Sequence, residues 1–356
     1  MGVTLMHHSK RVLLTGAAGF IGFHLADRLL ETEKDITVLG VDSLNDYYDI
    51  ELKNERLRIL QEKHGSRFVF KKLNLADKPA VSELFISFAP ETVINLAAQP
   101  GVRYSITHPD AYIESNIIGF YNILEACRHC CERQSGFRQL IFASSSSVYG
   151  LNSKIPYSTE DKTDSPVSLY AATKKSDELL AHAYAKLYSI PMTGLRFFTV
   201  YGPMGRPDMA YFSFTRKMIR GEKIQLFNNG DMYRDFTYVA DIVEGILKVA
   251  ASEPPVNQDG FRYRLYNIGG HHPEKLSDFV TILEECLLKE KLITKPAEKE
   301  YLPMQPGDVY QTCADMSPMQ KDFNFTPKTE LREGLEKFVS WYKEYYCNDD
   351  STTISK

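Results

Sequence analysis

Three residue types that together can remove a proton from an alcohol occur at a fixed spacing in the middle of the chain. A serine run, Ser144 to Ser147, is followed by Tyr170 and Lys174, four positions apart. Residues four apart on a helix share one face, so the phenol and the ammonium group would lie side by side. With a hydroxyl at the end of a strand, they would form a proton-abstracting site for a sugar alcohol. We therefore expect an enzyme.

This chemistry needs a hydride acceptor, and the N-terminal part of the chain predicts a binding site for one. The apolar strand Val12 to Thr15 precedes the glycine-rich segment Gly16 to Gly22 and an amphipathic helix. Glycines allow a tight turn close to a pyrophosphate, which would lie at the helix N-terminus. The spacing is G-x-x-G-x-x-G rather than G-x-G-x-x-G, so the prediction depends on the surrounding elements.

The second strand of this unit indicates which dinucleotide binds. The strand Ile36 to Val41 ends in Asp42, about 20 residues after the last glycine. A carboxylate there accepts hydrogen bonds from the adenosine ribose and would repel a 2′-phosphate, and no arginine follows it directly. The sequence favours NAD over NADP. The alternative is an ordinary turn with Asp42 as a helix cap.

Length and charge are those of a soluble catalyst. The chain has 356 residues, enough for a large core and two lobes, and a net charge of −4 without a basic block, so we expect no nucleic-acid partner. It contains no apolar run of membrane-spanning length, and Met1 to Lys10 lack the apolar stretch of a signal peptide. We expect no membrane association and a cytoplasmic location.

The six cysteines raise the question of a metal site. Cys127, Cys130 and Cys131 cluster beside His129, but no second ligand pair follows at the spacing of a zinc site. We expect core or surface thiols and no metal.

Apolar runs alternate with helical patterns from Arg11 to about Phe198, which is typical of a parallel sheet covered on both faces. We expect an α/β fold with a Rossmann-type doubly wound sheet over residues 10–200. Turn-forming residues and aromatics then interrupt shorter elements, which predicts a smaller substrate-binding lobe over residues 201–346, with some segments returning to the first domain. Residues 347–356 are polar, and we expect a disordered tail.

The sequence resembles the extended short-chain dehydrogenase/reductases, and within them the nucleotide-sugar 4-epimerases, most closely UDP-glucuronate 4-epimerases. The resemblance spans nearly the whole chain. The segments that carry it are Gly16 to Gly22, Asn95 to Gln99, Ser144 to Gly150, Tyr170 to Lys174, Leu195 to Asp208 and Arg234 to Thr237. It implies NAD as the cofactor and a UDP-sugar as the substrate.

The resemblance also implies the roles of the central residues. Tyr170 would take the O4 proton of the sugar while hydride leaves C4 for the nicotinamide. Since a free phenol stays protonated at neutral pH, Lys174 and the positive nicotinamide ring would have to favour the phenolate. Ser145 would bridge O4 and the Tyr170 oxygen. Ordinary packing is the alternative for a Tyr-x-x-x-Lys pair considered alone.

The residues that we expect to contact NAD come mostly from segments that follow the strands. They are Gly16, Gly19, Phe20, Ile21, Gly22, Asp42, Asn45, Asn74, Leu75, Leu96, Ala97, Ala98, Gln99, Asn116, Ser144, Tyr170, Lys174 and Phe197.

A uronic acid substrate needs an anchor for its carboxylate. An arginine fork binds a carboxylate through paired, charge-assisted hydrogen bonds, and the resemblance assigns this role to Arg206 with Thr199, to which Ser146 would add a hydroxyl. The alternatives are a simple pair between Arg206 and Asp208, or a subunit contact. Met204 stands where the family has Trp.

The nucleotide half of the substrate would be held by the C-terminal lobe. By resemblance, Arg234 contacts the pyrophosphate, Gln225 and Phe227 lie nearest the uracil, and Asp308 lies near the ribose. Gln305 stands where many relatives have Arg.

The serine run bears on the reaction outcome. Related dehydratases carry Asp-Glu at the positions of Ser146 and Ser147, and related UDP-glucuronate decarboxylases carry Glu at the position of Ser147. We therefore expect a transient 4-keto sugar that keeps its carboxylate and is reduced on its other face. This interconverts UDP-glucuronate and UDP-galacturonate, for surface polysaccharide.

Three alternatives stay open. They are a 4-epimerase of another UDP-hexose (UDP-GlcNAc/GalNAc or UDP-glucose/galactose), a UDP-glucuronate decarboxylase, and an NAD-binding sensor without turnover. By resemblance, the predicted helices Tyr112 to Cys131 and Tyr170 to Tyr188 pair across a twofold axis in a homodimer. The alternative is that both merely cover the sheet.

Overall fold

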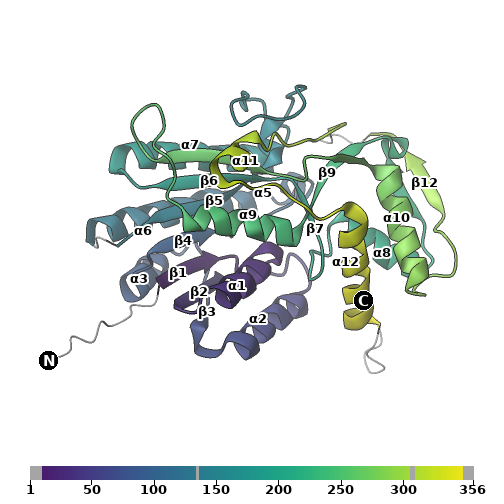
Figure 1. Ribbon diagram of the computed structural model, residues 1–356, viewed down its shortest axis with the longest axis horizontal. Coiled ribbons are helices and arrows are strands. Elements are labelled where there is room, and N and C mark those ends of the chain that lie inside the picture. Colours follow the sequence, from purple (N-terminus) through teal and green to yellow (C-terminus); the bar gives the residue numbers. More distant parts are fainter. Residues whose placement is uncertain (1–9, 134–135, 305–308, 348–356) are drawn as a thin grey trace.

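A seven-stranded sheet forms the centre of the larger lobe in the computed structural model, which describes residues 10–133, 136–304 and 309–347 (Figure 1). Its order is β3-β2-β1-β4-β5-β6-β10, and every neighbouring pair is parallel. The bounds are β1 Lys10–Thr15, β2 Ile36–Asp42, β3 Phe68–Lys72, β4 Thr92–Asn95, β5 Gln139–Ser145, β6 Met192–Phe197 and β10 Tyr263–Ile268. The Rossmann-type prediction is confirmed. The order reverses between β1 and β4, and open sheets bind ligands beyond the carboxyl ends of their strands at such a point.

Helices cover both faces of this sheet because its strands are apolar on both sides. Alternate residues of β1 belong to opposite layers: Val12 and Leu14 pack in one cluster and Leu13 in the other. One layer contains α1 Phe20–Thr32, α2 Ile50–His64 and α9 Val239–Ala251; the other contains α3 Lys78–Phe88, α6 Gly119–Arg133 and α7 Leu169–Tyr188.

The smaller lobe is built from two short sheets with helices around them, to the right in Figure 1. Because β10 and α9 come from the C-terminal half but pack in the larger lobe, the chain crosses between the lobes more than once. The strands are β7 Thr199–Tyr201, β9 Tyr233–Tyr238 and β11 Pro273–Lys275 in one sheet, and β8 Ile224–Phe227 and β12 Lys299–Leu302 in the other. The helices of this lobe are α8 Ala210–Ile219, α10 Leu276–Lys289 and α12 Leu331–Tyr346, whereas α11 Ser317–Phe323 packs against β10 and α9 of the larger lobe.

A π-helical turn interrupts the long helix predicted from Tyr112 onward. Two short helices, α4 Tyr104–Thr107 and α5 Pro109–Tyr112, lead into a π-helical turn, η2 Ile113–Ile118, which continues into α6. Such turns are rare and occur frequently at functional sites. The remaining short elements are the 3₁₀ turns η1 Gly65–Arg67, η3 Ser146–Tyr149 and η4 Asn228–Gly230.

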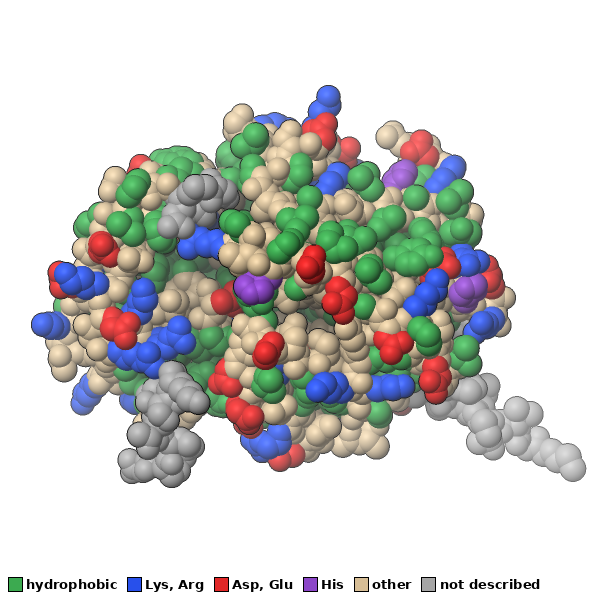
Figure 2. Space-filling model, turned by 180° about the vertical axis from the view of Figure 1, so that it is seen from behind, with side chains coloured by type: hydrophobic (Ala, Val, Ile, Leu, Met, Phe, Trp, Pro, Cys, Tyr) green, Lys and Arg blue, Asp and Glu red, His purple; other side chains and the backbone are tan. Residues whose placement is uncertain are grey.

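Charges of both signs mix on one face of the molecule. Figure 2 shows Lys and Arg side chains interspersed with Asp and Glu over the face that it presents. Among the described helices, none has the length and apolarity needed to span a bilayer. Within the described ranges, no cluster of three metal-ligating side chains occurs, and burial raises the pKa of the Cys127 thiol well above its usual value.

Candidate active site

The glycine-rich segment forms a tight turn between β1 and α1. Gly16 has a φ of +70°, and a Cβ added there would lie 2.8 Å from the main-chain nitrogen of Ala97. A Cβ at Gly22 would collide with the carbonyl oxygen of Gly16. Side chains at these positions are thus excluded, which leaves the N-terminus of α1 at Phe20 close to the cleft that the loop lines. This cradle suits a pyrophosphate.

Asp42 lies at the end of β2, beside the same turn. Its Oδ2 accepts a hydrogen bond from the Ala18 nitrogen at 3.2 Å, and its Oδ1 accepts one from Leu44 at 2.9 Å. It does not cap the next helix, because the N-cap of α2 is Asp49, whose side chain accepts from Glu51. The helix-cap alternative for Asp42 is therefore wrong.

A buried lysine that the sequence analysis missed fixes the neighbouring loop. Lys53 lines the cleft, and its Nζ donates to the main-chain oxygen and to Oδ1 of Asn45, at 2.6 and 2.7 Å. Asn45 in turn donates to Oε1 of Gln99, and the Gln99 nitrogen donates to Oδ1 of Asn116 at 2.7 Å. Burial lowers the pKa of Lys53, and Asp42 opposes that shift. A single lysine in an amphipathic helical pattern gives no signal of burial.

Most residues expected to contact the cofactor line one cleft at the carboxyl ends of the strands. They are Gly16, Gly19, Phe20, Ile21, Gly22, Asp42, Asn45, Asn74, Leu75, Leu96, Ala97, Ala98, Ser144, Tyr170 and Phe197. Gln99, Asn116 and Lys174 are buried and do not line it. The lining also includes residues that the sequence analysis did not name, among them Tyr47, Tyr48, Lys53, Ser115, Phe198 and Met209.

The serines at the end of β5 point to different surroundings. The hydroxyl of Ser144 donates to Oε1 of buried Glu178 at 2.6 Å. Ser145 lines the cleft, and its Oγ accepts a hydrogen bond from the Ser147 nitrogen at 3.2 Å, which caps η3. Tyr170 lines the same cleft from the first turn of α7. A hydroxyl and a phenol thus line one cleft.

Lys174 is fixed one helical turn after Tyr170. It is buried, and its Nζ donates to the Ala143 oxygen at 3.0 Å and to Oδ2 of Asp177 at 3.2 Å. Burial raises the pKa of Asp177 to about 7, while the nearby Lys174 ammonium lowers it. The cation is therefore held between α7 and β5, beside the strand end that carries the two serines.

A buried ion pair joins the elements that carry these groups. Arg196 of β6 donates to both carboxylate oxygens of Glu178 of α7, at 2.7 and 2.9 Å, and lies over the Tyr149 ring. Burial raises the pKa of Glu178, but hydrogen bonds from Arg196 and Ser144 bring it below its usual value. The charged pair thus links α7, β5 and β6 behind the cleft.

Arg206 lines the cleft and is engaged by a carboxylate of its own loop. Its Nε and Nη2 donate to the two oxygens of Asp208, at 3.0 and 2.6 Å, and the Tyr47 hydroxyl donates to Asp208 at 3.0 Å. The predicted pair with Asp208 is present. The guanidinium nevertheless lines the same cleft as Tyr170, and its role as an anchor for a substrate carboxylate stays a prediction.

The Tyr112 ring packs against the Tyr170 ring. The two rings meet edge to face with centroids 6.1 Å apart, and the Tyr112 hydroxyl donates to the Pro100 and Gly101 oxygens.

The other residues expected at the substrate lie apart from this cleft. Ser146, Thr199 and Arg234 line a neighbouring cleft together with Ser147 and Tyr157. Gln225 and Phe227 lie on β8 and line neither cleft: Gln225 donates to Glu300 at 2.8 Å, and the Arg103 guanidinium lies 4.9 Å from the centre of the Phe227 ring. Asp308 and Gln305 fall outside the described residues.

Comparison with known proteins identifies the class to which this fold and site belong. The chain belongs to the NAD dependent epimerase/dehydratase family, whose sequence model matches residues 12–269. The predicted membership in the extended short-chain dehydrogenase/reductases is confirmed; the protein is an NAD-dependent enzyme, and NAD is its cofactor.

Particular relatives narrow the comparison. The chain is 48% identical to Protein CapI of Staphylococcus aureus over 347 residues, 94% of this chain and 99% of that protein. It is 44% identical to UDP-glucuronate 4-epimerase 4 of Arabidopsis thaliana over 97% of this chain and 78% of that protein. The structure of UDP-glucuronic acid 4-epimerase from Bacillus cereus, in complex with UDP-glucuronic acid and NAD, superimposes with a TM-score of 0.83 at 33% identity, covering 94% of this chain and all of that chain.

Proposed function

We propose that the protein interconverts UDP-glucuronate and UDP-galacturonate by inverting C4 through a transient 4-keto sugar, without decarboxylation. The observation that carries this proposal is that Ser145, Tyr170 and Arg206 line one cleft with the glycine-rich loop. The similarity to UDP-glucuronate 4-epimerases supports the same reaction.

The glycine-rich loop and Asp42 would hold NAD, which supplies a hydride acceptor when bound. Tyr170 takes the proton from O4 through Ser145, and returns it when the sugar is reduced on its other face. Lys174, fixed by Ala143 and Asp177, favours the phenolate of Tyr170 because it places a positive charge one turn away. Lys53, through Asn45, keeps the loop beside Asp42 in place.

Arg206 would exchange Asp208 for the carboxylate at C6 of the sugar, since both anions suit the same fork. Thr199 and Ser146, in the adjoining cleft, would contribute hydroxyl groups, and Arg234 would bind the pyrophosphate. The 4-keto intermediate is a β-keto acid and can lose CO2 unaided. Ser146 and Ser147 supply no acid or base that would drive this loss, and the proposed site holds the carboxylate instead.

The first test is to incubate the purified protein with UDP-glucuronate and to resolve the products by NMR. We expect UDP-galacturonate without release of CO2. Formation of UDP-xylose or a 4-keto pentose would overturn the interpretation of Ser147. Conversion only of UDP-glucose or UDP-N-acetylglucosamine would overturn the role of Arg206.

A second candidate is a 4-epimerase of an uncharged UDP-hexose. The bidentate pair between Arg206 and Asp208 favours it, because a guanidinium satisfied by its own loop needs no carboxylate from the substrate. The same incubations with uncharged UDP-sugars separate the two candidates.

We also propose a homodimer formed through α7 and the helices around η2. Apolar side chains on these elements are exposed: Ile113, Ile118, Leu179 and Leu187. The cytoplasmic location and the use of the product in polysaccharide synthesis stay predictions.

A further inference from the structure

A buried arginine joins three loops of the cleft. Arg56 of α2 has no exposed surface. Its Nη1 donates to the Ala18 oxygen and to the Tyr48 hydroxyl, both at 2.7 Å. Its Nη2 donates to the oxygens of Met204 and Gly205, at 2.7 and 3.2 Å. One guanidinium therefore connects the glycine-rich loop, the loop after β2 and the loop after β7.

The loop after β7 is held in an uncommon conformation at these contacts. Met204 has a φ of +53°, a backbone conformation that residues other than glycine rarely adopt. A Cβ on Gly205 would collide with the Tyr211 hydroxyl. The ring of His24, from α1, lies with its Nε2 2.9 Å from the Pro203 oxygen. A strained backbone persists only where its surroundings enforce it. Arg56 and His24 both bind main-chain oxygens of this loop.

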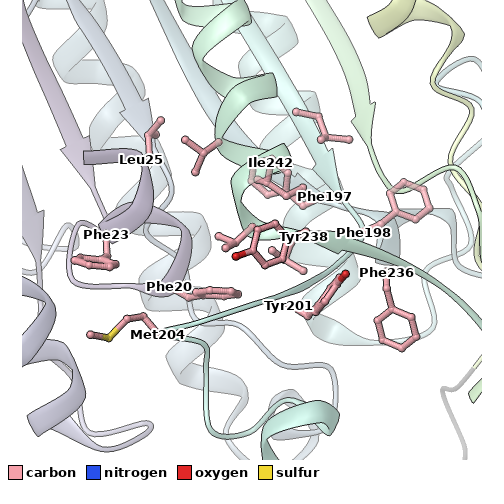
Figure 3. Close-up of a cluster of buried hydrophobic side chains, with 14 of the residues drawn as sticks. Phe20, Phe23, Leu25, Phe197, Phe198, Tyr201, Met204, Phe236, Tyr238 and Ile242 are labelled. Carbon is pink, nitrogen blue, oxygen red and sulfur yellow. The ribbon is translucent and has the colours of Figure 1, made fainter. Parts of the chain in front are cut away.

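The side chain of Met204 adds an apolar anchor. It is buried, and Figure 3 shows it with Phe20 and Phe23 of α1 in one cluster of hydrophobic side chains. The next residue but one is Arg206. The main chain that leads to Arg206 is thus anchored to α1 and α2, elements of the cofactor-binding half.

We propose that Arg56 is a positioning residue for Arg206 and sets the preference of the site for a charged over an uncharged UDP-hexose. This inference rests on the proposed function. A fork that binds a carboxylate through two hydrogen bonds tolerates little displacement, whereas a sugar without a carboxylate does not use it. Loosening the loop should therefore weaken the binding of UDP-glucuronate and leave the binding of UDP-glucose nearly unchanged.

The test is a double-mutant cycle on ligand selectivity. The Kd values of UDP-glucuronate and UDP-glucose are measured by calorimetry on NAD-loaded protein in a Tyr170→Phe background, which slows turnover. We expect Arg56→Met to raise the Kd of UDP-glucuronate about tenfold and the Kd of UDP-glucose less than about twofold. In an Arg206→Met background, Arg56→Met should change the selectivity no further, because the two residues act in one chain of contacts.

Arg67→Met is the matched control. Arg67 also donates to main-chain oxygens, those of Leu30 and Glu33 at the end of α1, at 2.8 and 3.1 Å, but it contacts none of the three loops. The preference of the Arg67→Met variant for UDP-glucuronate over UDP-glucose should equal that of the parent protein. Arg56→Lys keeps the charge and one donor group, so it should recover part of the preference, and it replaces Arg56→Met if that variant does not fold.

Equal weakening of both ligands by Arg56→Met would show a general structural role and overturn the proposal. Additive losses in the Arg56→Met/Arg206→Met pair would do the same. Failure of the proposed function is separately visible, because the parent protein would then neither convert UDP-glucuronate nor bind it in preference to UDP-glucose.

Discussion

Tyr170 and Ser145 line the same cleft from different elements, one from the first turn of α7 and one from the last residue of β5. Neighbouring Ser144 shares its residue type and strand with Ser145, but its hydroxyl faces the interior. Replacing each serine by alanine should therefore have different effects on kcat and on the free energy of unfolding.

Tyr170→Phe should lower kcat by about 10²-fold or more, the range that a positioned proton-transfer group contributes. The ring keeps its edge contact with Tyr112, so the fold should be unaffected. Initial rates with UDP-glucuronate, together with the circular dichroism spectrum, check both statements. An unchanged rate would favour a different base.

Ser145→Ala should reduce kcat without a comparable loss of stability. Ser144→Ala should instead reduce the free energy of unfolding by about 2 kcal/mol, because it removes a buried hydrogen bond to a charged carboxylate. Urea denaturation and initial rates on both variants measure the contrast. If Ser144→Ala has the larger effect on kcat at unchanged stability, the assignment of roles is reversed.

At the scale of elements, α1 and the loop after β7 meet at a titratable contact. Burial and the nearby charge of Arg56 lower the pKa of His24 to about 4, against the hydrogen bond to Pro203 and the charge of Asp27. A lowered pKa in the folded state means that the neutral ring stabilises the fold above the ordinary pKa of histidine. That contribution is lost as the pH falls toward 4.

His24→Gln keeps a donor for the Pro203 oxygen but removes the titration. Between pH 7.5 and pH 5, the parent protein should lose about 2 kcal/mol more unfolding free energy than the variant. Urea denaturation of both proteins at the two pH values gives this difference. Parallel pH dependences would mean that His24 titrates normally in the folded protein.

Local patterns in the sequence account for the elements and for the cofactor loop. Gly16 to Gly22, with strands on either side and Asp42 at the end of the second strand, are close enough in sequence for their spacing to predict the turn. Lys53 was missed because one lysine in an amphipathic helical pattern gives no signal of burial, and Arg56 was missed because its contacts are distant in sequence. Arg56 binds oxygens on Ala18 and Met204, 38 and 148 positions away, and such contacts leave no periodic signal.

At the scale of the whole molecule, exposed apolar side chains gather on helices that pack against one another. Leu179 and Leu187 of α7 are 60% and 70% exposed, and Ile118 of η2 is 43% exposed. α7 packs against η2 and α6, so these side chains belong to one side of the larger lobe. An apolar face of this kind is typical of a subunit contact.

Leu179→Lys should convert a dimer into a monomer, because it places a charge in the apolar face. Multi-angle light scattering measures the mass directly. Leu151→Lys is the control, since Leu151 is 74% exposed but lies on a loop outside these helices. A parent protein that is already monomeric would overturn the proposed contact.

The π-helical turn η2 changes the angular phase of the helix in which it lies. Each residue of an α-helix advances by about 100°, and a π turn inserts one residue more than the regular repeat. Before it, Tyr112 faces the carbonyls of Pro100 and Gly101; after it, Asn122 of α6 donates to Leu75. Deleting one residue from η2 would rotate Asn122 by about 100° about the helix axis relative to Tyr112. The helix could then keep either the Tyr112 hydrogen bonds or the Asn122 hydrogen bond, but not both.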